Sequence, residues 1–196
     1  MGETTRAVSR EGLSPSAEGK GPLLERDYWS ALQRSRLRPS EIMAEVKAHF
    51  ASFAPSELAR FSAADRPLRL GDEIDIAIAG AGECRVRVVH CDELSVTLAT
   101  MRGHPEAGRI TFGAYRNRDG EVVFHIRSRA RSDSFMRLLG FFAAGEAMQT
   151  NTWAAFISRV AAIAGARVTG VHAQMRRLPD EEDGPVDQPT YIARAD

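Results

Sequence analysis

The sequence has no surplus of charge of either sign and very little lysine. Basic and acidic residues number 26 each, so the formal net charge is zero. This balance argues against a general nucleic-acid binder, which normally carries a strongly basic face. Lysine is confined to Lys20 and Lys47. The other bases are arginines, whose planar guanidinium favours paired contacts with carboxylates or phosphates, so local anion binding stays open.

Cysteine is scarce, and long apolar runs are missing. The two cysteines, Cys84 and Cys91, form no C-x-x-C pair and no disulfide framework that would indicate secretion. No apolar run approaches the ~20 residues of a membrane span. Residues 1–20 also lack the apolar core of a signal peptide. Together these absences predict a cytoplasmic protein without a membrane span.

The two ends of the chain differ in composition from its middle. Residues 1–24 are rich in Gly, Ser, Glu and Thr without periodicity, and we expect a disordered arm there. Residues 179–196 begin with an acidic run between two prolines, and we expect a disordered, solvated tail. Residues 25–178 remain as a single domain. The apolar content of the chain, 43%, is typical of a globular protein.

The first third of this domain has helical patterns. Asp27 is a candidate cap for a helix over residues 27–36. A second helix is expected from Pro39, where apolar residues recur at helical spacing. A short third helix is expected from Pro55, and it includes Phe61.

The middle of the chain alternates between apolar and polar residues. Five such runs lie near residues 74–78, 86–88, 96–98, 110–114 and 122–126. Short turns separate them, so the pattern predicts an antiparallel meander with one face on the core. A long helix is expected over residues 132–164, which makes the fold class α+β. The tract 168–178 fits either a last edge strand or an extension over the domain.

The hexapeptide Gly-His-Pro-Glu-Ala-Gly at residues 103–108 lies between two expected strands and is predicted to be a loop. His104 and Glu106 are candidate catalytic residues, because histidine transfers protons near neutral pH and a carboxylate can orient it. The alternative is structural, with both residues holding the loop through backbone hydrogen bonds.

The long helix carries an apolar stripe that contains Phe142 and Trp153. The same face carries Glu146 and Gln149 at its centre. If this face packs on the sheet, both polar groups line a cavity and need partners there. If instead the helix breaks at Gly145, Glu146 faces water.

Three residues near the ends of the meander, Tyr115, His125 and Arg127, are candidates for a cavity mouth or an anion-binding patch. The alternative for the arginines of these strands is a solvated outer face paired with acids such as Glu73 and Asp75. No His or Cys spacing supports a metal site, and no cofactor motif occurs.

The tracts 84–89, 98–108 and 110–112 resemble a small family of bacterial and plant proteins, the domain-of-unknown-function family catalogued as nineteen-ninety. The residues that match its turn and its helix are Gly103, His104, Pro105, Glu106, Gly108 and Gln149. The likeness spans about residues 70–160. The family looks related to the START and birch-pollen-allergen-like (helix-grip, SRPBCC) superfamily.

That relationship implies a curved antiparallel sheet gripping a long C-terminal helix, here with N-terminal helices, and an apolar cavity between sheet and helix. The superfamily implies binding of lipids, sterols, polyketides or aromatic metabolites, and in some members cyclase, hydratase or hydrolase chemistry. Fold-level analogy of this kind does not fix function.

Three hypotheses follow. The first is binding of a small, mostly apolar metabolite or lipid with a polar end in the cavity between sheet and helix. Its expected binding residues are Gln149, Phe112, Phe142, Trp153, Tyr115, His125 and Arg127. The second is a cofactor-independent cyclase, dehydratase or hydrolase that uses His104, Glu106 and Glu146. The third is a regulatory or interaction module without a cavity, including a homodimer formed through exposed apolar surface.

Overall fold

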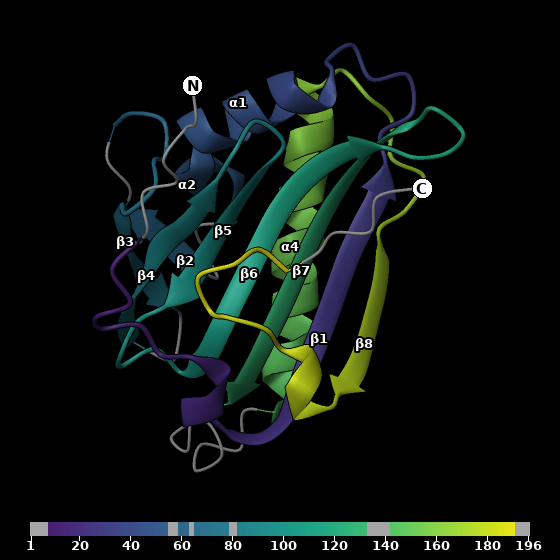
Figure 1. Ribbon diagram of the computed structural model, residues 1–196. Helices are drawn as coiled ribbons and strands as arrows, with labels where there is room; N and C mark the ends of the chain where they lie inside the picture. The colour runs from purple at the N-terminus through teal and green to yellow at the C-terminus, as the bar shows by residue number, and fades with distance from the viewer. Residues whose placement is uncertain (1–7, 55–58, 63–64, 79–81, 133–141, 191–196) are drawn as a thin grey trace.

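The computed structural model describes residues 8–54, 59–62, 65–78, 82–132 and 142–190 (Figure 1). Residue 59 and residues 142–149 are described by their backbone alone. The elements, in chain order, are η1 (Ser16–Glu18), β1 (Lys20–Ala31), α1 (Pro39–Ala48), α2 (Phe50–Phe53), β2 (Ala59–Ser62), β3 (Glu73–Ile78), β4 (Gly82–Cys91), β5 (Ser95–Thr100), β6 (Glu106–Arg116), β7 (Val122–Ser132), α4 (Phe142–Ile163), β8 (His172–Leu178) and η2 (Asp180–Glu182).

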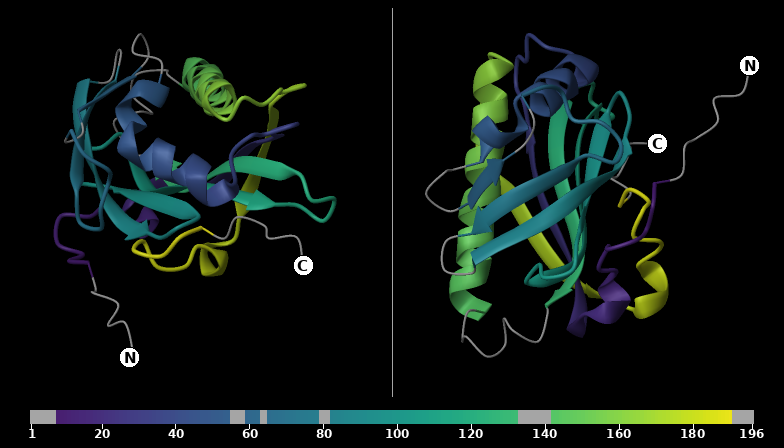
Figure 2. Two further views of the ribbon diagram at one scale, coloured as in Figure 1. Left: turned by 90° about the horizontal axis from the view of Figure 1, so that it is seen from above. Right: turned by 90° about the vertical axis from the view of Figure 1, so that its left-hand side faces the viewer.

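One sheet organises the molecule. Its strand order is β2-β3-β4-β5-β6-β7-β1-β8, and its pairings are antiparallel. Viewed along its length, the sheet curves around α4, with α1 and α2 on the same side (Figure 2). The predicted α+β architecture, a curved antiparallel sheet gripping a long helix, is confirmed. The side facing the helices is called the concave face below, and the other side the convex face.

The predicted meander corresponds to β3 through β7. Alternation sets its register, because residues two apart on a strand share one face. Phe112 of β6 pairs with Ile126 of β7, and both are fully buried on the concave face. The next pair, Gly113 and His125, lies on the convex face.

The predicted helix over residues 27–36 is wrong, because residues up to Ala31 belong to β1 and residues 32–36 form a turn with an isolated bridge at Gln33. This strand lies between β7 and β8, and Tyr28 is paired with Ile126. The spacing of Tyr28 and Leu32 fits a helix as well as a strand. The segment forms a strand because it pairs on both sides with strands far along the chain, and the local sequence pattern carries no information about these partners.

The other helix predictions fare differently. The second helix is confirmed as α1, whose first turn is closed by Glu41 accepting the Arg38 backbone N–H at 2.7 Å. The third is wrong at Phe61, which lies on β2, while residues 55–58 lie outside the described part. The long helix is confirmed over Phe142–Ile163 as α4, whereas Ser132 ends β7 and residues 133–141 lie outside the described part. The ambiguous tract 168–178 contains the edge strand β8.

The described parts of both ends of the chain differ from the disordered segments expected of them, while residues 1–7 and 191–196 lie outside the described part. Residues 8–24 include η1 and the start of β1, and residues 179–190 include η2. Leu13 and Val186 pack with Val89 and Ala99 in a small apolar cluster on the convex face. The described parts of both ends therefore form a third layer, on the opposite side of the sheet from the helices (Figure 2).

Candidate functional site: a buried arginine on the concave face

One half of the concave face is filled by aromatic rings. Phe112 lies at the centre, with ring centroids of Phe50 and Phe156 each 5.1 Å away and that of Trp153 5.5 Å away. The three phenylalanines are at most 2% exposed, whereas Trp153 is half-buried. Phe112 and Trp153 therefore lie together in a packed cluster that anchors the C-terminal half of α4 to the sheet, and their expected contact with a ligand stays a prediction.

The other half of the concave face contains a buried charge. Arg26 of β1 is 6% exposed and is paired with Ser128 of β7. Its Nη1 lies 3.2 Å from Glu106 Oε1, within ion-pair distance. Neither Nη1 nor Nε makes a hydrogen bond to any described residue. A buried guanidinium with unpaired donors is costly, so this site needs an acceptor.

The neighbourhood of Arg26 combines small, polar and half-buried apolar side chains. Ser128 and Ala130 of β7 point to the same face, while Leu24 and Ile110 are only half-buried there. Met175 of β8 is the residue paired with Arg26, and it is 50% exposed. The β8 edge of the concave face is therefore exposed at Met175, whereas Arg26 beside it is buried.

The predicted loop at residues 103–108 is shorter than expected, because Glu106 to Gly108 begin β6, and the remaining turn holds His104 against its own backbone. His104 Nδ1 lies 3.0 Å from the backbone nitrogen and 2.9 Å from the backbone oxygen of Glu106. Gly103 has φ 91°, a left-handed conformation that favours glycine. Burial lowers the pKa of His104, although the charge and backbone of Glu106 act in the opposite direction. The imidazole thus ties the loop together, while the Glu106 side chain reaches Arg26.

Besides Trp153, three predicted site residues lie on α4, and their side chains are outside the described part. The helical backbone includes Phe142, Glu146 and Gln149. The expectation that Glu146 and Gln149 face a cavity stays a prediction.

Three other predicted site residues, Tyr115, His125 and Arg127, lie on the convex face, away from Arg26. Asp27 Oδ1 lies 2.6 Å from His125 Nε2 and 2.6 Å from Arg127 Nε. Burial alone raises the pKa of Asp27, but hydrogen bonds and charge from His125 and Arg127 bring it below its usual range. The sheet therefore separates this ionic cluster from the concave residues.

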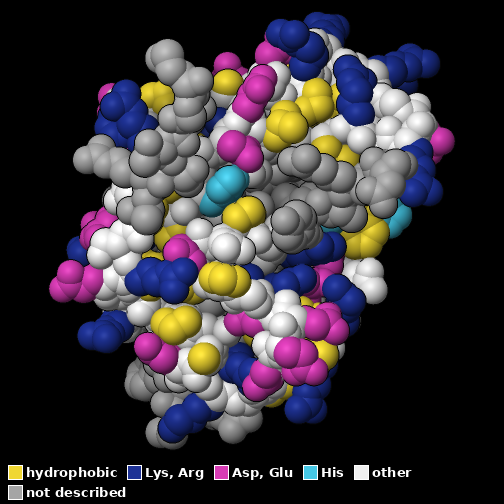
Figure 3. Space-filling model, in the orientation of Figure 1, with side chains coloured by type: hydrophobic (Ala, Val, Ile, Leu, Met, Phe, Trp, Pro, Cys, Tyr) yellow, Lys and Arg dark blue, Asp and Glu magenta, His cyan; other side chains and the backbone are white. Residues whose placement is uncertain are grey.

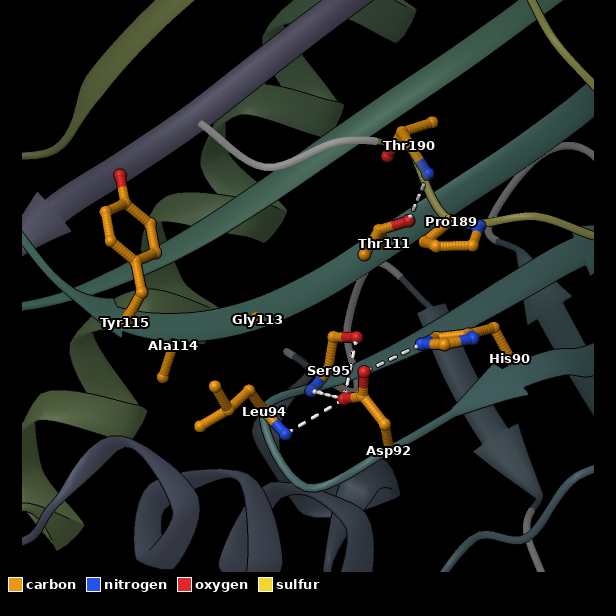
Figure 4. A pocket seen from close by; sticks show the side chains of 10 residues that line it. All are labelled: His90, Asp92, Leu94, Ser95, Thr111, Gly113, Ala114, Tyr115, Pro189 and Thr190. Atoms are coloured by element: carbon orange, nitrogen blue, oxygen red, sulfur yellow. Dashed lines mark hydrogen bonds and ion pairs between the residues drawn. The ribbon is translucent and has the colours of Figure 1, made fainter. Parts of the chain in front are cut away.

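A pocket of about 350 Å³ lies on the convex face beside Tyr115 (Figure 4). Its lining residues are His90, Asp92, Leu94, Ser95, Thr111, Gly113, Ala114, Tyr115, Pro189 and Thr190. Asp92 Oδ1 accepts the backbone N–H groups of Leu94 and Ser95, and Oδ2 pairs with His90 at 3.0 Å. The Asp92 carboxylate therefore stabilises the β4–β5 turn. Its hydrogen bonds within the turn make it less available to a ligand in the pocket.

Sequence reasoning missed Arg26, because the misassigned helix placed it outside any strand. Within the described ranges, no three His, Cys, Asp or Glu side chains converge in a way that could hold a metal ion. No helix among the described residues is both long and apolar enough to cross a membrane.

The comparison with protein families settles the resemblance. A family model described as "Domain of unknown function (DUF1990)" matches residues 41–172, more than half of the chain. The chain belongs to this family. The DUF1990 match includes the loop at His104 and Glu106 as well as α4, whereas β1 with Arg26 precedes it. A search of curated proteins found no match.

Several solved structures are similar to this DUF1990 member. Protein CV1439 from Chromobacterium violaceum has 12% identity and a TM-score of 0.49, covering 73% of this chain and 98% of that one. The di-domain ARO/CYC StfQ from the steffimycin biosynthetic pathway has 13% identity and a TM-score of 0.49, covering 73% and 51%. Major latex-like protein 151 from Panax ginseng has 14% identity and a TM-score of 0.42, covering 74% and 99%. At these values the likeness carries no inference about ligand or chemistry.

Proposed function

We propose that this protein binds a small amphipathic metabolite on the concave face of its sheet, with an anionic group of the ligand on Arg26. The apolar body of the ligand lies against half-buried side chains such as Ile110 and Trp153. Sites of this kind are mostly apolar with a few polar groups that fix the orientation of the ligand.

The observation that carries this proposal is the buried guanidinium of Arg26, two of whose donors make no hydrogen bond to the described residues. Its Nε and Nη1 donors are buried and lack a hydrogen-bond partner among the described residues. Nε–H and Nη1–H point in different directions, and Nη1 lies beside Glu106, so an oxyanion of the ligand accepts a charge-assisted hydrogen bond from Nε. The nearby carboxylate of Glu106 balances the charge while leaving those donors unpaired.

The polar side chains around Arg26 support a ligand of limited polarity. Ser128, the residue paired with Arg26 on β7, supplies a hydroxyl group. Leu24 and Ile110 supply apolar surface on the same face. Met175, at the β8 edge beside Arg26, is exposed. An apolar molecule with one anionic end satisfies both the unpaired donors and the uncovered apolar surface.

The enzymatic alternative uses the same face. In that hypothesis His104, Glu106 or Glu146 transfers a proton in a cyclisation, dehydration or hydrolysis of the bound metabolite. It shares the requirement for Arg26 as the orienting cation, and it remains a prediction.

Binding of anilinonaphthalene sulfonate, an apolar fluorophore with one anionic group, tests the proposal. We expect Arg26→Met to weaken binding by about 10-fold or more, because a hydrogen-bonded ion contact is lost. Arg26→Lys, which keeps the charge but loses the Nε donor, gives an intermediate affinity. The matched control is Arg85→Met, since Arg85 is half-exposed and paired with Asp75 and Glu73.

Near-ultraviolet circular dichroism establishes that each variant keeps its tertiary packing, because loosened folds also bind this dye. Equal affinity of the wild type and a folded Arg26→Met variant would show that the guanidinium does not hold the ligand.

A further inference from the structure

The convex face of the sheet carries an excess of positive charge. On β1, β6, β7 and β8, its charged side chains are five arginines and two carboxylates, a formal excess of three positive charges. They are Arg109, Arg127, Arg129, Arg131, Arg176, Glu25 and Asp27. Glu25 is fully buried between Arg129 and Arg176, and Asp27 is held by Arg127. Arg109 and Arg131 have no carboxylate partner on the described strands of the sheet on this face.

Residues 179–190, here called the C-terminal strap, supply the missing carboxylates. Asp183 Oδ1 accepts from Arg109 Nη1 at 2.9 Å, and Asp180 pairs with Arg131. Backbone oxygens of residues 182 and 183 accept from Arg129. In Figure 1 the strap crosses in front of the sheet at η2, and Figure 3 shows acidic and basic side chains adjoining on this face.

The strap also has an apolar and a backbone anchor. Val186 is 9% exposed and packs against Leu13, Val89 and Ala99. The backbone N–H of Thr190 donates to Thr111 Oγ1 at 3.0 Å. The face therefore contacts an acidic peptide, which begins with the helical turn η2, through two carboxylates three residues apart and an aliphatic side chain three residues later.

The C-terminal strap leaves some buried donors of the convex face without a hydrogen bond. The buried Nε atoms of Arg109 and Arg131 have no hydrogen-bond partner among the described residues. The side chain of Asp180 is 80% exposed, so its ion pair with Arg131 adds little stability. An acidic segment that fits better would form the hydrogen bonds to Arg109 Nε and Arg131 Nε that the strap does not form.

We propose that the convex face is a docking surface for an acidic peptide segment of a partner protein, in exchange with the C-terminal strap. The segment has the pattern of Asp180, Asp183 and Val186: acid, two residues, acid, two residues, aliphatic. This site is separate from the concave face and does not depend on the ligand proposed there.

The strap competes with any partner at an effective concentration in the millimolar range, as expected for a short tether. Weakening the strap while leaving the arginines intact therefore strengthens binding in trans. A face that the strap never leaves binds no peptide in trans, so tighter binding on weakening the strap shows that peptide and strap compete for one surface.

The test uses a fluorescein-labelled peptide with the sequence of residues 179–190, added to the full-length chain. We expect the Asp180→Asn/Asp183→Asn variant to bind it at least about 10-fold more tightly than the wild type, because its own strap competes less. Adding Arg131→Gln to that variant lowers the affinity again. Asp75→Asn, an exposed acid paired with Arg85 elsewhere on the sheet, is the matched control and leaves binding unchanged.

If the double variant does not fold, the single variant Asp180→Asn replaces it in the test. We expect this variant to fold, because Asp180 is mostly exposed. No binding to any folded strap variant, or an affinity that survives Arg131→Gln, overturns the proposal. Equal binding of a scrambled peptide of the same charge also overturns it, because the face then recognises charge without spacing. Retention of heparin without retention of the peptide would mark a polyanion site instead.

Discussion

Arg26 and Glu106 lie 80 positions apart in the sequence, yet their Nη1 and Oε1 atoms are 3.2 Å apart on the concave face. Arg26 comes from β1, and Glu106 begins β6, with β7 between them. Their side chains are 7% and 17% exposed, so both charges are largely removed from water. This pair links the family's loop to the buried guanidinium.

Removal of the Glu106 charge should destabilise the free protein. Glu106→Gln leaves Arg26 buried without its neighbouring carboxylate, and we expect the free energy of unfolding to fall by about 1–3 kcal/mol. Urea denaturation measures this loss. The double variant Arg26→Met/Glu106→Gln should lose less than the sum of the two single variants, because neither charge then remains alone. Strict additivity would show that the two groups do not interact.

Truncation of the central ring should open a cavity in the packed half of the face. Phe112→Ala removes a fully buried ring in contact with Phe50, Phe156 and Trp153, at an expected cost of about 3–5 kcal/mol. Phe112→Leu, which keeps most of the volume, should cost clearly less. Thermal and urea unfolding of both variants provide the measurement, and equal losses would contradict tight packing at this position.

The lowered pKa of His104 should appear in the pH dependence of stability. In the unfolded chain His104 binds a proton near pH 6.5. In the folded protein its pKa is lower, so it binds that proton only at lower pH. Stability therefore falls as the pH drops below about 6.5, by up to about 1.4 kcal/mol per pH unit, until the folded pKa is reached. His104→Gln should flatten this part of the profile, measured by denaturation between about pH 8 and 5. An unchanged slope would contradict the prediction.

The buried carboxylate of Asp27 should matter far more than an exposed one. Asp27→Asn removes the charge shared by His125 and Arg127, and we expect a loss of about 3 kcal/mol or more. Asp75→Asn breaks an exposed pair with Arg85 and should cost about 1 kcal/mol or less.

The pKa of Asp27 is lowered in the fold, so its contribution is complete above its unfolded pKa of about 3.9. The contribution is lost as the pH falls through the folded pKa. Equal losses for the two asparagine variants at neutral pH would refute the distinction between buried and exposed pairs.

The meander from β3 to β7 could be predicted, because its strands pair with their sequence neighbours and alternate clearly. Ile74, Val86, Leu98, Phe112 and Phe124 all face the core as their alternation indicates. Such local hairpins need only turn residues and period-two patterning, both of which are present in the sequence.

β1 and its charges could not be predicted from local pattern. Its register depends on β7 and β8, about 100 and 150 residues later. Arg26 becomes a buried concave residue, and Asp27 a buried convex one, only once those strands flank them. The same holds for the acidic run after Pro179, whose partners Arg109 and Arg131 lie far upstream.

The most direct test of the account is the nuclear magnetic resonance signal of the Arg26 Nε–H group during titration with anilinonaphthalene sulfonate. The signal is assigned through its loss in the Arg26→Lys variant. If Arg26 holds the anionic group, this signal shifts downfield with the ligand concentration while that of Arg85 stays in place. An Arg26 signal that does not move at saturation would contradict the central claim.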